Sequence, residues 1–196
     1  MLKDIYMIRH GETLFNIQGR TQGWCDSPLT IQGIQQAKES KKFFENNKLT
    51  FDAYFSSTSE RACDTIELLF PDITYKRLKG LKEQNFGAFE GHPQYLEPPI
   101  PNRSTFFVPY GGESWQELSE RLKNTLVIIF EENIGLQKIL CCSHGAGIST
   151  LMKSVSTAEQ IERLHGIRNL DMMHFTLDDT SKELNAIEKI QTIFEN

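Results

Sequence analysis

The sequence predicts an α/β protein in which helices cover both faces of a largely parallel sheet. Short apolar runs of strand length, such as 5–9 and 138–142, alternate with longer segments such as 31–46, whose apolar residues recur at helical spacing. Strand–helix alternation of this kind implies parallel strands joined by crossover helices. The 196 residues, 39% of them hydrophobic and 24% charged, are enough for one substantial core and short for two. We therefore expect one domain over residues 1–196.

Each element follows from a local pattern, beginning with the strand over 5–9. Thr30 is expected to cap the helix over 31–46, and Ser114 forms a capping box with Glu117 at the start of a long amphipathic helix. The remaining predicted elements are, in chain order, a strand at 51–55, a helix over 61–69, an edge strand near 73–75, a strand at 138–142, a small-residue helix through Met152, a polar helix near 157–165 and a last strand at 172–177. The tail from Lys182 fits either a helix or an edge strand.

Residues 86–113 show no sustained period and are rich in proline and glycine. A long irregular segment in a compact domain is usually functional or mobile, so we expect a substrate cap here. Its aromatic residues could line a pocket entrance or pack the segment onto the core; they are Tyr95, Phe106, Phe107 and Tyr110. Glu90 is expected to order the loop, and His92 borders it. His165 and His174 are interpreted as a helix-surface residue and a strand residue.

Composition and charge exclude several classes of function. The formal charge of −5 gives no general reason to bind nucleic acid or anionic lipid, so any anion site must be local. No stretch approaches the roughly 20 apolar residues that cross a bilayer, and residues 1–10 do not resemble a secretory signal. The four cysteines have neither a CxxC motif nor zinc-like spacing to histidine. We expect a cytoplasmic protein with reduced thiols and with no bound metal or cofactor.

Polar side chains follow three of the predicted strands at the point where each strand ends. Arg9 and His10 come after the first strand, Arg61 lies just after the second, and His144 follows the strand at 138–142. In parallel sheets, ligands bind beyond the carboxyl ends of the strands. We therefore expect these side chains to share one rim of the sheet and to form an active site there.

These residue types suit the transfer of a phosphoryl group to a histidine. A neutral imidazole can act as a nucleophile, and His10 is the candidate. Guanidinium groups match phosphate geometry, so Arg9 and Arg61 are expected to bind phosphate oxygens, and His144 to donate a further hydrogen bond. The leaving alkoxide needs a proton, for which Glu83 is the best-placed carboxyl group. The same carboxylate could then deprotonate the water that hydrolyses phosphohistidine.

The order of these motifs resembles that of the histidine phosphatase superfamily, also called the phosphoglycerate mutase-like family. The resemblance runs from about residue 4 to residue 175, and its motifs lie at 9–16, 22–30, 56–65, 81–91, 111–114 and 143–145. It implies a three-layer α/β/α sandwich and a chemistry that needs no metal or cofactor. It also implies that His10 is phosphorylated and that Glu83 is the proton donor. The residues expected to contact the substrate or to lie close by are Thr13, Asn16, Gln22, Gly23 and Gly145.

The same residues can serve hydrolysis or transfer between two hydroxyls. In the mutases of the family, the segment after the acid carries adjacent arginines and a lysine, whereas residues 84–113 contain only Arg103 besides His92. We therefore predict a metal-independent phosphomonoesterase of the histidine acid phosphatase type, acting on a small phosphorylated metabolite. The aromatic cap suggests an apolar or planar leaving group. The alternatives are a cofactor-dependent phosphoglycerate mutase-type phosphotransferase and a non-catalytic relative that binds a phosphorylated ligand. The substrate and the oligomeric state stay open.

Overall fold

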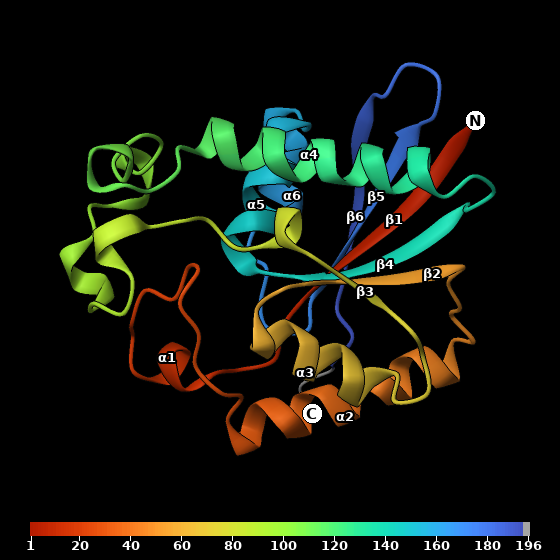
Figure 1. Cartoon of the computed structure of the whole chain (residues 1–196), viewed down its shortest axis with the longest axis horizontal. Helices are drawn as coiled ribbons and strands as arrows, with labels where there is room; N and C mark the ends of the chain where they lie inside the picture. Colours follow the sequence, from red (N-terminus) through yellow and green to blue (C-terminus); the bar gives the residue numbers. More distant parts are fainter. Residues whose placement is uncertain (194–196) are drawn as a thin grey trace.

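The computed structural model describes residues 1–193 and has the α/β architecture that the sequence predicts (Figure 1). Its strands are β1 (Leu2–Arg9), β2 (Ala53–Ser57), β3 (Lys76–Leu78), β4 (Lys138–Ser143), β5 (Met172–Asp178) and β6 (Leu184–Ile190). Its α-helices are α1 (Leu14–Ile17), α2 (Ile31–Asn46), α3 (Glu60–Leu69), α4 (Trp115–Glu132), α5 (Gly145–Ser154) and α6 (Ala158–Leu164). The predicted caps of α2 and α4 are present, because the Thr30 and Ser114 hydroxyls accept hydrogen bonds from the backbone N–H groups of Gly33 and Glu117, each three residues further on.

The six strands form one mixed sheet in the order β3-β2-β4-β1-β5-β6. The pairings among β3, β2, β4 and β1 are parallel, whereas β5 and β6 are added in antiparallel orientation beside β1. The expectation of a mostly parallel sheet is therefore confirmed. The ambiguous tail from Lys182 contains strand β6, because Leu184 and Ala186 alternate with exposed residues and pair with β5.

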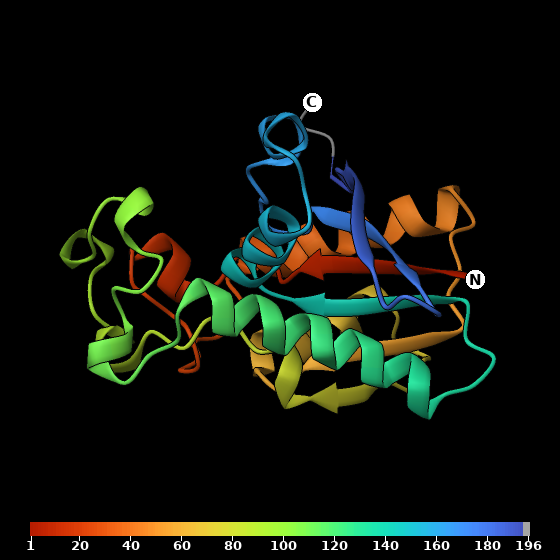
Figure 2. The ribbon, with the colours of Figure 1, turned by 90° about the horizontal axis from the view of Figure 1, so that it is seen from above.

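Helices cover both faces of the sheet and enclose two apolar clusters (Figures 1 and 2). On one face, Met7 and Cys141 pack with buried residues of α4 and α5; on the other, Ile8 and Cys142 pack with those of α2 and α3. Consecutive strand residues point to opposite faces, so each strand supplies both clusters. The arrangement is the expected three-layer α/β/α sandwich.

Two predicted strands are displaced. β2 covers Ala53–Ser57 rather than 51–55. The strand begins later because the Asp52 carboxylate accepts hydrogen bonds from the backbone N–H groups at the start of β4. It also ends later, because the polar residues Ser56 and Ser57 are fully buried in the sheet. The edge strand expected near 73–75 is β3. That strand has only three residues and is polar and largely exposed, so apolar spacing does not reveal it.

Residues 86–113, called the cap below, contain only single 3₁₀ turns and lie beyond the carboxyl ends of the parallel strands (Figures 1 and 2). Most of the cap aromatics pack against one another. Phe107 is fully buried, with ring centroids 4.8 Å from Phe86 and 5.1 Å from Phe106. Tyr110 joins the same cluster, whereas Tyr95 is 83% exposed. Phe106, Phe107 and Tyr110 therefore pack the cap rather than line a pocket entrance.

Candidate active site

The ends of β1 and β4 bring two histidines together. Arg9 and Ser143 are register partners in the parallel β1–β4 pair, so the residues that follow each of them emerge side by side. The rings of His10 and His144 lie with centroids 5.3 Å apart. As expected, the side chains that follow β1 and β4 therefore lie together at one rim of the sheet.

His10 is held as a neutral imidazole with one free nitrogen. Its Nδ1 lies 2.7 Å from the Gly11 carbonyl oxygen, and since a carbonyl only accepts, the Nδ1–H must donate. Burial lowers the pKa of His10 well below its usual value, and the charges of Arg61 and Arg9 lower it further. The second nitrogen, Nε2, has no hydrogen-bond partner within residues 1–193. A lone pair is thus available on Nε2 at neutral pH.

His144 is completely buried behind His10. Its Nε2 lies 2.8 Å from the Ser57 hydroxyl, while its Nδ1 is buried without a partner in the part of the chain that the structure describes. Burial and the charge of Arg61 lower the pKa of His144 well below its usual value. Because an unpaired buried polar atom is costly, Nδ1 marks a position where a ligand oxygen would be stabilised.

Two arginines, the buried Arg61 and the half-buried Arg9, lie beside the histidines. Arg61 is 1% exposed, and its terminal nitrogens donate to the Asp26 carboxylate at 2.9 Å and to the Gly23 carbonyl at 2.9 Å. Arg9 donates to the Ile167 carbonyl at 2.9 Å, and burial lowers its pKa. The Nε atoms of both arginines are buried without a partner among residues 1–193. A site with two cations and unused donors attracts an anion.

Glu83 is held at the beginning of α5. Its carboxylate oxygens accept hydrogen bonds from the backbone N–H groups of Gly147 at 2.7 Å and Ala146 at 3.0 Å. The α4 residue Arg121 donates to the Glu83 carbonyl at 3.0 Å and is itself paired with Glu113 at 2.7 Å. The helix terminus and the Arg121 anchor together fix the position of this carboxyl group at the rim.

Three of the expected substrate-binding residues form a hydrogen-bonded unit in the loop after β1. The buried Thr13 hydroxyl donates to the Gln22 amide oxygen at 2.8 Å, and the Thr13 N–H donates to the Asn16 amide oxygen at 3.1 Å. The Gln22 amide nitrogen is also occupied, because it donates to Ser27 at 3.0 Å. The Asn16 amide nitrogen has no partner within residues 1–193 and borders the cavity, so Asn16 is the one with a free donor.

The two expected glycines lie where the chain has no room for a side chain. Gly23 has a positive φ of 53°, and a Cβ there would lie 2.4 Å from a Glu90 carboxylate oxygen. That carboxylate accepts from the backbone N–H of Trp24 at 2.7 Å, so Glu90 orders the loop as expected. A Cβ on Gly145 would lie 3.1 Å from Arg9 Nε. Both glycines thus allow the backbone to approach the site closely.

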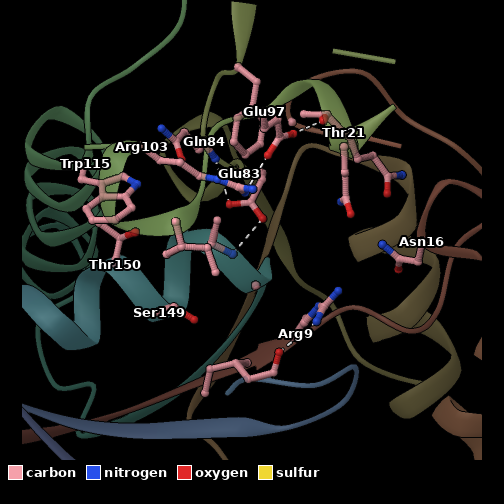
Figure 3. Close-up of a pocket in the computed structure, with 18 of the residues that line it drawn as sticks. Arg9, Asn16, Thr21, Glu83, Gln84, Glu97, Arg103, Trp115, Ser149 and Thr150 are labelled. Atoms are coloured by element: carbon pink, nitrogen blue, oxygen red, sulfur yellow. Dashed lines mark hydrogen bonds and ion pairs between the residues drawn. The ribbon is translucent and has the colours of Figure 1, made fainter. Parts of the chain in front are cut away.

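These side chains surround a cavity of about 510 Å³ (Figure 3). The residues expected at the site that line this cavity are Arg9, His10, Asn16, Gln22, Gly23, Arg61, Glu83 and Gly145. Thr13 and His144 lie behind this wall. His165, expected to be only a helix-surface residue, also borders the cavity, whereas His92 does not, and His174 lies in β5 as expected.

The segment before β5 supports the site in a way the sequence did not reveal. Asn169 donates to the His10 carbonyl at 2.8 Å, and the Leu170 N–H donates to the Arg9 carbonyl at 3.1 Å. Neither Asn169 nor Arg121 carries a sequence signal, because each acts through backbone carbonyls contributed by a distant segment.

Two kinds of feature are missing from residues 1–193. No group of three or more histidine, cysteine, aspartate and glutamate side chains is arranged to hold a metal ion. None of the described helices is both long and apolar enough to span a membrane.

Comparison with known proteins identifies the family. The family model of the histidine phosphatase superfamily (branch 1) matches residues 5–189. The chain belongs to this superfamily. An adenosylcobalamin/alpha-ribazole phosphatase of Escherichia coli (strain K12) is 30% identical over 184 residues, which cover 89% of this chain and 85% of the relative.

Two further relatives show the range of this histidine phosphatase family. A 2,3-bisphosphoglycerate-dependent phosphoglycerate mutase of Bradyrhizobium sp. (strain BTAi1 / ATCC BAA-1182) is 28% identical over 76% of this chain and 78% of the mutase. The crystal structure of a phosphoserine phosphatase mutant from Entamoeba histolytica, in complex with phosphoserine, has a TM-score of 0.77 at 27% identity, covering 96% of this chain and 97% of that one. The relatives include both phosphatases and mutases, and they support a phosphatase without specifying its substrate.

Proposed function

We propose that the protein is a metal-independent phosphomonoesterase that works through a phosphohistidine on His10. The observation that carries this proposal is the hydrogen bond of 2.7 Å from His10 Nδ1 to the Gly11 carbonyl, which leaves Nε2 unprotonated and free at the cavity. Arg9 and Arg61 favour the neutral ring and supply the positive charge that a phosphoryl group needs.

The first half-reaction moves the phosphoryl group to the protein. His10 Nε2 attacks phosphorus while the bond between phosphorus and the ester oxygen breaks, and the leaving alkoxide takes a proton from the Glu83 carboxyl group. The unpaired Nε–H groups of Arg9 and Arg61 and the Nδ1 of His144 are the donors for the phosphoryl oxygens. A positioned general acid contributes about 10²–10⁴-fold to such a step.

The second half-reaction returns the protein to its starting state. The Glu83 carboxylate takes a proton from a water molecule, the water oxygen attacks phosphorus, and the nitrogen–phosphorus bond breaks. Inorganic phosphate leaves, and His10 Nε2 regains its lone pair while Glu83 is again protonated. One carboxyl group thus acts as acid in one step and as base in the next.

Hydrolysis is favoured over mutase chemistry by the charge of the cap. Its one arginine, Arg103, is ion-paired with Glu97 at 2.6 Å, so the cap offers little free positive charge to retain a bisphosphate intermediate. The non-catalytic alternative is disfavoured because the nucleophile, both arginines and the acid line one cavity, and the second histidine lies next to the nucleophile.

The test compares phosphate release with phosphate transfer. Wild-type protein and His10→Ala should be assayed on p-nitrophenyl phosphate, and the wild type also on 3-phosphoglycerate with a 2,3-bisphosphoglycerate primer. We expect phosphate release by the wild type only, and release that exceeds the formation of 2-phosphoglycerate. Release by His10→Ala at the wild-type rate would refute the mechanism, and mutase turnover faster than release would replace the hydrolase assignment with the mutase.

A further inference from the structure

The cavity extends well past the phosphate site, along one face of α5. Ala146, Ser149, Thr150 and Lys153 follow one another at helical spacing and all line the cavity, whereas Ile148 and Leu151 on the opposite face are completely buried in the core. In the view of Figure 3, Trp115 and Thr150 lie on one side of Glu83 and Asn16 lies on the other. The cavity therefore has a catalytic end and a distal end, with Glu83 between them.

The middle of this face offers unused hydrogen-bonding groups. Within residues 1–193, the hydroxyls of Ser149 and Thr150 have no hydrogen-bond partner, and neither has the indole N–H of Trp115. All three side chains are drawn in Figure 3 at the cavity wall. Free hydroxyls and an indole N–H on the wall of one cavity suit a chain that is itself hydroxylated, because such a chain both donates and accepts hydrogen bonds and presents C–H groups to the indole ring.

The distal end carries a positive charge that no acid balances. The Lys153 ammonium lies 5.5 Å from the centre of the Trp115 ring and has no ion-pair partner in the part of the chain that the structure describes. Arg103, another cation that lines the cavity, is already paired with Glu97 at 2.6 Å. An anionic group would be stabilised beside Lys153 more than beside Arg103.

The length of α5 sets the size of a molecule that could contact both the catalytic end of the cavity and Lys153 at its distal end. Ala146, whose N–H contacts Glu83, and Lys153 are seven residues apart, which is about 10 Å along a helix at about 1.5 Å per residue. A three-carbon acid has two carbon–carbon bonds of about 1.5 Å, which laid end to end cover about 3 Å of that distance, whereas the five bonds of a six-carbon chain cover about 7.5 Å. A three-carbon acid is therefore too short, whereas a six-carbon chain comes within reach of the flexible lysine side chain.

We propose that the substrate is a phosphomonoester whose leaving group is a hydroxylated chain of about six carbons that ends in an anionic group, a carboxylate or a second phosphate, bound by Lys153. This inference rests on the phosphatase activity proposed above and adds its substrate class. It replaces the expectation of an apolar or planar leaving group, which rested on cap aromatics that pack among themselves. The deciding cation comes from α5, outside the cap.

The test uses two substrates that differ only at the distal end, 6-phosphogluconate and sorbitol 6-phosphate. The measured quantity is the ratio of their kcat/KM values, for the wild type, Lys153→Met, Lys153→Arg and Lys42→Met. Lys42 is an exposed lysine of α2, on the other side of the sheet, so its replacement makes the same change in net charge away from the cavity. We expect the wild type to prefer the acid about fivefold, as one exposed charge pair allows, and Lys153→Met to lose that preference. Lys153→Arg and Lys42→Met should keep it.

The outcomes separate this inference from the function on which it rests. If p-nitrophenyl phosphate is hydrolysed in a His10-dependent manner but the wild type shows no preference for the acid, the substrate class is wrong and the phosphatase stands. A preference that persists in Lys153→Met also overturns the inference. Comparison of fructose 6-phosphate with fructose 1,6-bisphosphate repeats the test with a phosphate as the distal anion. If none of the esters, including p-nitrophenyl phosphate, is hydrolysed, the phosphatase itself fails.

Discussion

Arg121 should support catalysis without touching the substrate. From α4 its guanidinium donates to the carbonyls of Gly80, Lys82 and Glu83 at 2.8, 3.0 and 3.0 Å, and it forms a two-point ion pair with Glu113. The Arg121→Met change keeps an unbranched apolar stem and removes all of these bonds. The segment that carries Glu83 then loses its anchor on α4.

The size of the effect follows from these contacts. Hydrogen bonds from charged donors contribute about 1.5–3 kcal/mol each when buried, and the Arg121 side chain is 21% exposed, so we expect a loss of about 2–4 kcal/mol in the free energy of unfolding. A displacement of the Glu83 carboxyl group by about 1 Å costs up to about 100-fold in the rate of the step it assists. We therefore expect kcat/KM for an alkyl phosphate to fall between about tenfold and 100-fold.

The leaving group shows whether Arg121 acts through Glu83. A nitrophenolate leaves without a proton, whereas an alkoxide needs one, so kcat/KM for p-nitrophenyl phosphate should change much less than that for an alkyl phosphate. Arg77→Met is the matched control. Arg77 makes exposed ion pairs with Glu60 and Glu67 and an exposed hydrogen bond to Tyr75, so its replacement should cost less than about 1 kcal/mol and no activity. An equal loss on both esters in Arg121→Met, or none on either, would refute the reasoning.

Three further predictions concern the acid, the support of the nucleophile and its titration. Glu83→Gln should lower kcat/KM for alkyl phosphates about 10²–10⁴-fold and for p-nitrophenyl phosphate far less, and equal losses would exclude Glu83 as the proton donor. Asn169→Ala should lower kcat about tenfold with little change in KM, because the His10 carbonyl loses its hydrogen bond from Asn169. Steady-state kinetics measure both constants, and an unchanged kcat would show that Asn169 does not position His10. Burial and the charges of Arg61 and Arg9 lower the pKa of His10, so its ring should titrate below pH 6.5 by NMR. The free energy of unfolding should decrease as pH falls below about 6.5, because the unfolded chain takes up a proton there that the folded His10 does not. An NMR midpoint at or above 6.5 would contradict the neutral nucleophile.

The sequence predicted which side chains lie together at the rim of the sheet, because these residues sit in short contiguous motifs at strand ends. His10 and His144 directly follow β1 and β4, and the parallel pairing of those strands brings them together. The apolar runs of both strands are visible in the sequence, so their position along the chain was also predictable. The exposed, three-residue β3 has no such run, and its position was wrong by about three residues.

The supporting contacts and the distal end were not predictable in this way. Asn169 and Arg121 bind backbone carbonyls that lie 159 and 38 residues away in the chain, and any residue type can supply a carbonyl. Lys153 becomes part of the cavity only because α5 packs beside α4 and brings it over Trp115. Contacts of this kind depend on the assembled layers and leave no local pattern.

The most direct test of the account is the chemical state of His10 during turnover. A rapid acid-free quench of the protein with p-nitrophenyl phosphate, followed by mass spectrometry of its peptides, should find one phosphoryl group on the peptide that contains His10. The Glu83→Gln variant should still form this species and should lose it more slowly, because the carboxylate that activates water is missing. Turnover by the wild type without any phosphohistidine, or with the phosphoryl group on His144 instead of His10, would contradict the central claim.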